Sequence, residues 1–185
     1  MSAIAITVAY GEVPGPELLE AALFVLREAG AALTVDSIEI GKRIYDMQYP
    51  LGILPASFNT LNHSRMLLMG PVAKPEGEQY KHPGEVIREY YGLTEEHKLT
   101  GALNDNHGCT AYISDQFALF EPRETTLASC LLACIFLLEH IGQHDIGDSI
   151  RRALEHTLSE GVAAQPLMQR LLGTAQSETM HFAEA

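Results

Sequence analysis

The side chains best suited to chemistry form a basic group near the middle of the chain: Lys74, Lys81, His82 and Arg88. Residues 70–84 are rich in proline and glycine, which predicts a loop leading into a short helix. Lysine, arginine and histidine can hold a carboxylate through charge-assisted hydrogen bonds. These four residues are therefore a candidate carboxylate-binding site, although Arg88 on its own is more typical of an ordinary helix surface.

Other reactive side chains have no spacing that assigns them a role. His82, His107 and Cys109 fall in expected loops, where a new active site is one interpretation. No pattern of nucleophile, base and orienting group joins them. An enzyme built on these loops stays an open alternative, ranked behind the noncatalytic interpretations below.

The sequence predicts neither a metal centre nor a bound cofactor. Cys130 and Cys134 share one helical face inside an apolar segment, which indicates buried, unreactive thiols. His140 and His144 are spaced like a metal-binding pair, but Gly142 between them is expected to end the helix. The spacing of these residues is better explained by packing than by ligation.

Composition and charge limit the classes of partner. Twelve Lys and Arg against twenty-four Asp and Glu give a net charge of −12, which repels a polyanion, so we expect no nucleic-acid partner. The most apolar stretch, residues 127–141, is shorter than the roughly 20 residues that span a bilayer, so we expect no membrane partner. An odd number of cysteines without C-x-x-C spacing favours a reducing compartment and a cytoplasmic location.

Strand-like and helix-like segments alternate along the chain, which predicts an α/β fold. We expect strands at residues 3–9, 33–40, 65–69 and 117–120, and helices at 17–29, 55–64, 85–91, 123–141, 145–161 and, weakly, 166–172. Residues 93–114 have no strong period and are expected to be irregular. The predicted architecture is layered: a mixed, mainly parallel sheet with helices on both faces and the 127–141 helix packed centrally.

Several short motifs follow one another in a recognisable order. They are YGEVPGPE (10–17), IGKRIY (40–45), LGILP (51–55), LMGPVAKP (68–75), LTGAL (99–103), FALFEP (117–122), TLASCLL (126–132) and ETMHFAE (178–184). In this order they resemble the decarboxylating β-hydroxyacid dehydrogenases, the isocitrate/isopropylmalate dehydrogenase family, and they track its isocitrate branch. The resemblance covers about residues 3–93 and 99–160, with a weaker tail.

The resemblance implies that residues 1–185 form one domain, equivalent to the family's larger domain only. Its smaller domain, which carries the metal-binding aspartates, the catalytic Tyr and Lys and the dimer interface, would fall in the gap between Leu93 and Leu99. The family's nucleotide loop is cut down to residues 122–126. In the substrate loop Lys74, His82 and Gly84 replace the family's Thr, Ser and Asn, so that only Arg88 matches a substrate arginine.

The resemblance therefore implies a pseudoenzyme of the NAD(P)-dependent hydroxyacid dehydrogenases, with no cofactor and no catalytic residues. We expect a noncatalytic interaction or scaffold protein. The alternative is a regulatory or sensing subunit that binds a carboxylate metabolite near Lys74, Lys81, His82 and Arg88. Faces that the missing domain would cover are expected to meet a partner, either further copies of the chain in a homo-oligomer or another protein.

Overall fold

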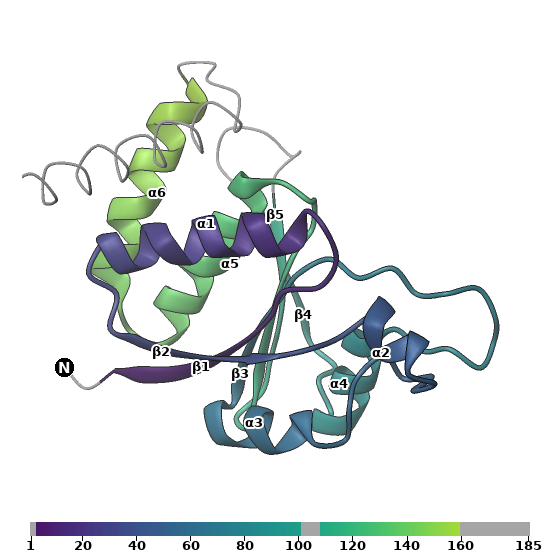
Figure 1. Ribbon diagram of the computed structural model, residues 1–185. Helices are drawn as coiled ribbons and strands as arrows, with labels where there is room; N and C mark the ends of the chain where they lie inside the picture. The colour runs from purple at the N-terminus through teal and green to yellow at the C-terminus, as the bar shows by residue number, and fades with distance from the viewer. Residues whose placement is uncertain (1–2, 101–107, 160–185) are drawn as a thin grey trace, which may run out of the picture.

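The protein is built on a single mixed sheet (Figure 1). The computed structural model describes residues 3–100 and 108–159. Within these residues the strands are β1 (Ile4–Ala9), β2 (Leu33–Ile38), β3 (Met66–Met69), β4 (Glu96–Thr100), β5 (Gly108–Ile113) and β6 (Ala118–Pro122), in the order β2-β1-β3-β6-β5-β4. The pairs β2–β1, β1–β3 and β3–β6 are parallel, and β5 runs antiparallel to both β6 and β4. The predicted mixed, mainly parallel sheet is confirmed.

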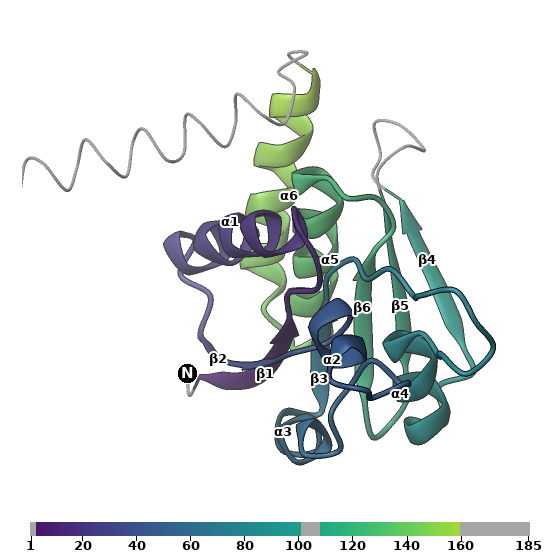
Figure 2. The same ribbon diagram turned by 45° about the vertical axis from the view of Figure 1, so that its right-hand side comes forward.

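Helices cover both faces of the sheet, as Figure 2 shows from a second side. One face carries α1 (Gly15–Glu28), α5 (Leu127–His140) and α6 (His144–Ser159). The other carries α3 (Ser57–Ser64) and α4 (Pro83–Tyr91), while the short α2 (Lys42–Asp46) follows the end of β2. None of the helices in the described ranges is long and apolar enough to cross a membrane.

The alternation of side chains along the strands divides the core in two. Leu68 and Phe120 face the layer of α1, α5 and α6, and their neighbours Leu67 and Leu119 face the layer of α3 and α4. Helix α5 is buried almost all round, because apolar residues occupy every side of it. Its central position between the sheet, α1 and α6 confirms the prediction for residues 127–141.

The prediction of irregular structure at residues 93–114 is wrong, because β4 and β5 both lie entirely within that range. Strand β5 buries the small residues Cys109 and Ala111 where a stronger strand signal would have large apolar ones. Strand β4 (EHKLT) is largely polar, and its pairing with β5 from Glu96↔Tyr112 to Thr100↔Gly108 holds it in the sheet. Tertiary pairing overrides the weak local signal here.

The helix boundaries differ from the prediction in smaller ways. Helix α5 begins at Leu127 and not at residue 123, because the Thr126 side chain accepts a hydrogen bond from the Ser129 N–H and caps the helix. Helix α2, which has little more than one turn, was not predicted. The weak helix expected at residues 166–172 lies outside the described residues.

The loops that follow β1 and β3 touch backbone to backbone. Gly70 N–H donates to the Ala9 carbonyl at 2.7 Å, and Glu12 N–H donates to the Pro71 carbonyl at 2.9 Å. A side chain at Gly70 would stand 2.2 Å from the Tyr10 carbonyl oxygen. This contact fixes where the loop after β3 leaves the sheet, and that loop leads to the basic residues and to α4.

Candidate functional site

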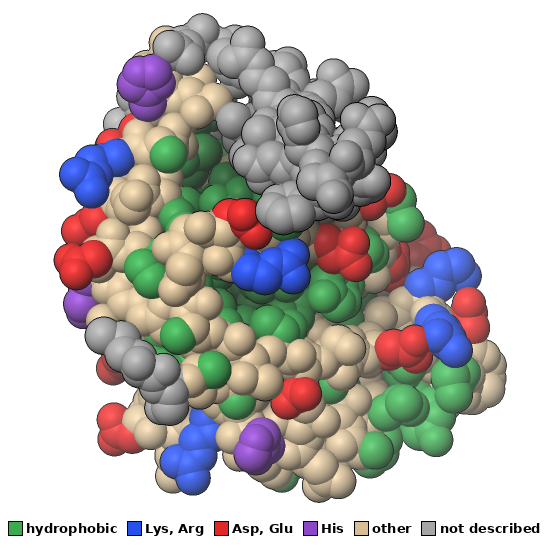
Figure 3. Space-filling view, turned by 60° about the vertical axis from the view of Figure 1, so that its left-hand side comes forward, with side chains coloured by type: hydrophobic (Ala, Val, Ile, Leu, Met, Phe, Trp, Pro, Cys, Tyr) green, Lys and Arg blue, Asp and Glu red, His purple; other side chains and the backbone are tan. Residues whose placement is uncertain are grey.

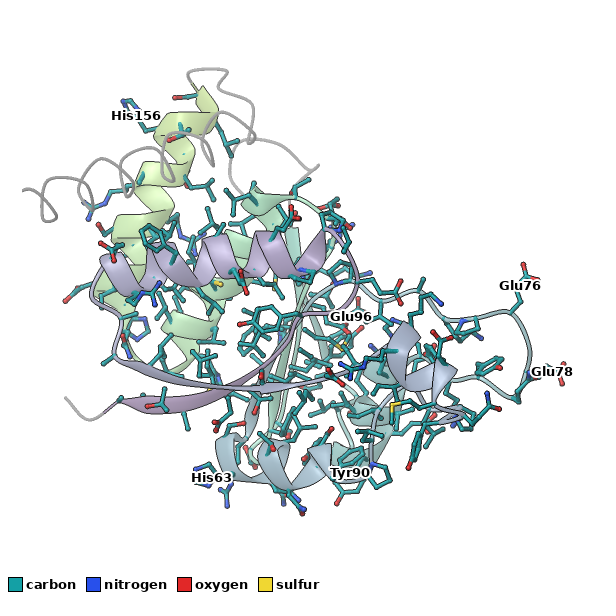
Figure 4. The ribbon with its side chains drawn as sticks, in the orientation of Figure 1. His63, Glu76, Glu78, Tyr90, Glu96 and His156 are labelled. Carbon is teal, nitrogen blue, oxygen red and sulfur yellow. The ribbon has the colours of Figure 1, made fainter. Side chains whose placement is uncertain are left out.

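A polar cluster lies where α4 crosses the far half of the sheet. We call it the Arg88 cluster, and it consists of Arg88 from α4, Glu121 from β6, Tyr112 from β5 and Glu96 from β4. In Figure 4 Glu96 lies toward the body of the protein, whereas Glu76 and Glu78 project from the outer part of the loop between β3 and α4. Arg88 and Glu121 in the inner cluster are mostly buried, whereas Glu76 and Glu78 are exposed.

Arg88 contacts a carboxylate of its own chain. Its Nη1 lies 3.4 Å from Glu121 Oε2, and its guanidinium lies 4.6 Å from the centre of the Tyr112 ring. The side chain is 25% exposed. The prediction of an ordinary helix-surface residue is therefore too simple, because Arg88 is held between an acid and an aromatic ring.

Glu121 is the most perturbed acid of the cluster. Its side chain is only 18% exposed, and this burial raises its pKa from 4.5 to about 7. Nearby Glu96 raises the pKa further, and Arg88 opposes both effects. Burial outweighs the cation because the Arg88 contact is long for a charge-assisted hydrogen bond. Glu121 is thus a carboxyl group that exchanges its proton near neutral pH.

His82 has a structural role at the start of α4. Its Nδ1 accepts the Gly84 N–H at 3.1 Å, so its Nε2 carries the proton and donates to the Val72 carbonyl at 3.2 Å. Burial lowers the pKa of His82, and Arg88 and Lys74 lower it further, while Val72 and Glu85 oppose this. The neutral ring is the form that caps the helix, so it is poorly suited to attract an anion.

The structure brings only part of the predicted basic group together. Lys74 and Arg88 both act electrostatically on His82, but Lys81 turns to Glu89, with its Nζ 2.8 Å from a Glu89 carboxylate oxygen. A shallow hollow of about 410 Å³ beside Arg88 is lined by Glu85, Glu89, Gly92, Leu93 and Thr94. Two acids and one base line that hollow, which disfavours a carboxylate ligand. The carboxylate-binding site stays a prediction.

The other reactive side chains do not form a site in the described residues. Cys109 is fully buried, which raises the pKa of its thiol to about 12, so a nucleophilic thiolate is disfavoured. Cys130 and Cys134 are also buried, and their pKa values are raised for the same reason. His107 lies outside the described residues. Within the described ranges no three His, Cys, Asp or Glu side chains are placed to hold a metal ion.

The sequence did not single out Glu121, Tyr112 or Glu96. Tyr112 and Glu96 lie in residues 93–114, for which the sequence predicts no strand and therefore no strand neighbours. Glu121 carried a usable signal, because an acid directly after the apolar run Ala118–Phe120 and before Pro122 must sit at the end of a buried strand. Only the sheet order places it under Arg88.

The fold belongs to a known class. It matches the crystal structure of isocitrate dehydrogenase from Methylococcus capsulatus with a TM-score of 0.70 and 13% identity, over 85% of this chain and 91% of that one. No protein-family model matches the chain. The mixed sheet with its flanking helices is that of the isocitrate/isopropylmalate-type dehydrogenases, as the motifs predicted.

The sequence relatives point to the isocitrate branch. The chain is 29% identical over 160 residues to isocitrate dehydrogenase [NADP] of Rickettsia typhi, which covers 83% of this chain and 32% of that protein. It is 37% identical over 84 residues to the same enzyme of Rickettsia bellii, covering 45% of this chain and 17% of the relative. The chain is similar to the isocitrate dehydrogenases, and it spans about a third of the length of the first protein named here.

Proposed function

We propose that this chain is a noncatalytic isocitrate dehydrogenase-like protein that acts as an interaction or scaffold module. The connection between α4 and β4 carries the proposal. Helix α4 ends at Tyr91 and is capped by Gly92, and β4 begins at Glu96 and pairs with β5. By the resemblance, the family's smaller domain would enter between Leu93 and Leu99. Here those residues lead directly into a strand of the sheet, which supports a single domain without that insertion.

The turn after β6 supports the proposal independently. By the resemblance it corresponds to the family's nucleotide loop, and its residue Glu124 is hydrogen-bonded to β5 and α5. Glu124 accepts hydrogen bonds from the Ser129 hydroxyl at 2.8 Å and from the Gly108 N–H at 3.2 Å. A carboxylate at this point repels a nucleotide phosphate, so these residues do not fit NADP in the manner that the resemblance implies.

An activity assay tests the proposal. The purified full chain is given Mg²⁺ or Mn²⁺, NAD or NADP, and isocitrate, isopropylmalate or tartrate. We expect no reduced nicotinamide above the rate without protein, while a full-length dehydrogenase assayed in parallel gives ordinary turnover of about 1–10³ s⁻¹. Protein-dependent cofactor reduction with any of the three acids would overturn the proposal.

A sensing function is the second candidate, because Lys74, Lys81, His82 and Arg88 form a locally basic stretch in an acidic chain. Internal contacts of Lys81, His82 and Arg88 count against it. In a thermal-shift assay with di- and tricarboxylates, a ligand at ten times its Kd stabilises a protein by about 1.4 kcal/mol. We expect no such shift. A saturable shift that Lys74→Ala abolishes, and that Lys42→Ala on α2 leaves intact, would favour the sensor.

The proposal extends to partners and location. An interaction module needs a partner, which is either a further copy of this chain or another protein. The three cysteines are free and buried, which supports residence in a reducing compartment such as the cytoplasm.

A further inference from the structure

Among residues 3–100 and 108–159, strand β2 lies at an edge of the sheet and pairs with β1 alone. The Ala32 carbonyl accepts a hydrogen bond from the Ile4 N–H at 3.0 Å. Because backbone groups of a strand point to alternate sides, the N–H and C=O groups of the even-numbered residues of β2 point toward β1. The N–H and C=O groups of Val35 and Ser37 therefore point outward. Residues 34–37 are exposed. Edge strands are usually blocked by charged side chains, above all lysine, by proline or by a bulge. Strand β2 (LTVDSI) has one charged residue, Asp36, and neither lysine, proline nor a bulge.

Helix α1 places an ordered stripe above this edge. Glu20, Leu23, Phe24 and Arg27 follow the i, i+3, i+4, i+7 spacing of one helical face. Together with Tyr10, Leu26, Ala31, Leu33 and Val35 they line a hollow of about 430 Å³. Figure 3 brings this side of the molecule forward and shows a hollow floored by hydrophobic side chains with charged ones at its rim. Along the helix, the stripe therefore has an acid at one end (Glu20), two apolar residues in the middle and a base at the other end (Arg27).

The β2 edge and the α1 stripe can each pair with the same surface of a second copy of the chain. In an antiparallel pair of β2 strands centred on Val35, Val35 faces its own copy and Leu33 faces Ser37, which matches the outward-pointing groups. Thr34 then faces Asp36, so no two like charges are opposed. The same twofold axis makes the two α1 helices antiparallel, which sets Glu20 of each copy against Arg27 of the other.

We propose that β2 and α1 form the surface of a twofold dimer, in which β2 pairs with β2 of a second copy and extends the sheet. The reversed order of charge along α1 favours a second copy over an unrelated peptide, since only an antiparallel copy of the same stripe pairs both charges. This inference goes beyond the proposed function and does not depend on it, because the surface exists whether or not the chain turns over a hydroxyacid.

Sedimentation of the full chain gives the first test. Val35 is 43% exposed, so Val35→Lys leaves the fold intact while it sets two ammonium groups against each other on the twofold axis. We expect a dimer that this change weakens at least about tenfold. Val13→Lys, at a site 82% exposed and outside the surface, is the matched control and stays dimeric. A monomeric wild-type chain, or a dimer that Val35→Lys leaves unchanged, overturns the proposal.

Charge reversal and cross-linking test the geometry itself. Glu20→Arg and Arg27→Glu each weaken the dimer by bringing like charges together, and the double variant regains affinity. Val35 residues facing each other would have Cα atoms about 5.5 Å apart, within disulfide range. Val35→Cys therefore cross-links on oxidation and Val13→Cys does not, while the native thiols are buried. Failure of the double variant to recover, or equal cross-linking at both positions, contradicts this pairing.

Discussion

Replacing Glu121 with Gln is expected to remove a pH dependence of stability that reaches at most about 3 kcal/mol. The pKa of Glu121 is raised from 4.5 to about 7, mainly by burial. The folded state therefore holds the proton more tightly than the unfolded state does. Its contribution is fully present below about pH 4.5 and is lost as the pH rises through about 7, so this group makes the wild-type chain less stable at pH 8 than at pH 5.

Glu121→Gln keeps an acceptor for Arg88 but cannot ionise. Urea denaturation at about pH 5 and pH 8 measures the effect as a difference between the two proteins. That difference cancels contributions common to both, such as those of His82 and His140, whose lowered pKa values act in the opposite direction. Glu78→Gln, on the outer loop, should follow the wild type (Figure 4). If wild type and Glu121→Gln lose stability in parallel, Glu121 does not titrate as described.

Gly70→Ala is expected to destabilise the protein by about 1–3 kcal/mol, the usual range for overpacking. The new methyl group would stand 2.2 Å from the Tyr10 carbonyl oxygen and 2.9 Å from the Tyr10 carbonyl carbon. Both are backbone atoms, so they cannot swing aside as a flexible side chain can. The loops after β1 and β3 must separate, which breaks the contact that aligns them.

Gly147→Ala on α6 is the matched control for this substitution. Its nearest neighbour is 3.6 Å from the new methyl group, an ordinary contact, and alanine is favoured over glycine within a helix by roughly 0.5–1 kcal/mol. We expect this variant to be as stable as the wild type or slightly more so. Thermal unfolding distinguishes Gly70→Ala from Gly147→Ala, since a change of 1 kcal/mol in stability shifts Tm by about 2–4 °C in a chain of this size. Equal melting of Gly70→Ala and wild type would contradict the close approach.

The fold could be predicted from sequence where one element carried its own signal. The apolar run of α5, the β-branched run of β1 and the alternation of β2 each identify an element without reference to the rest of the chain. Strands β4 and β5 could not be predicted, because small and polar residues form them and only mutual pairing stabilises them. The local sequence pattern predicts an element where one face of it is strongly buried. It fails where pairing with neighbouring strands determines whether the segment forms a strand.

The candidate site was predicted in part for a similar reason. Arg88 could be found from the family resemblance, but its partner Glu121 lies 33 positions further along the chain. Sequence reasoning treated the basic residues as available to a ligand. Their actual partners, Glu89 for Lys81 and the Val72 carbonyl for His82, depend on how α4 and its loop fold back. Which groups remain free is a property of the tertiary structure.

The two borders of the sheet differ in a way that limits growth. The border opposite β2 is β4, where Glu96 and Lys98 have opposite charges and pair at 3.4 Å. A strand with these charged side chains disfavours edge-to-edge pairing with a further strand, whereas β2 favours such pairing. Joining through β2 therefore leaves a polar β4 at each outer end, so the pairing would close at two copies and would not continue into a fibre.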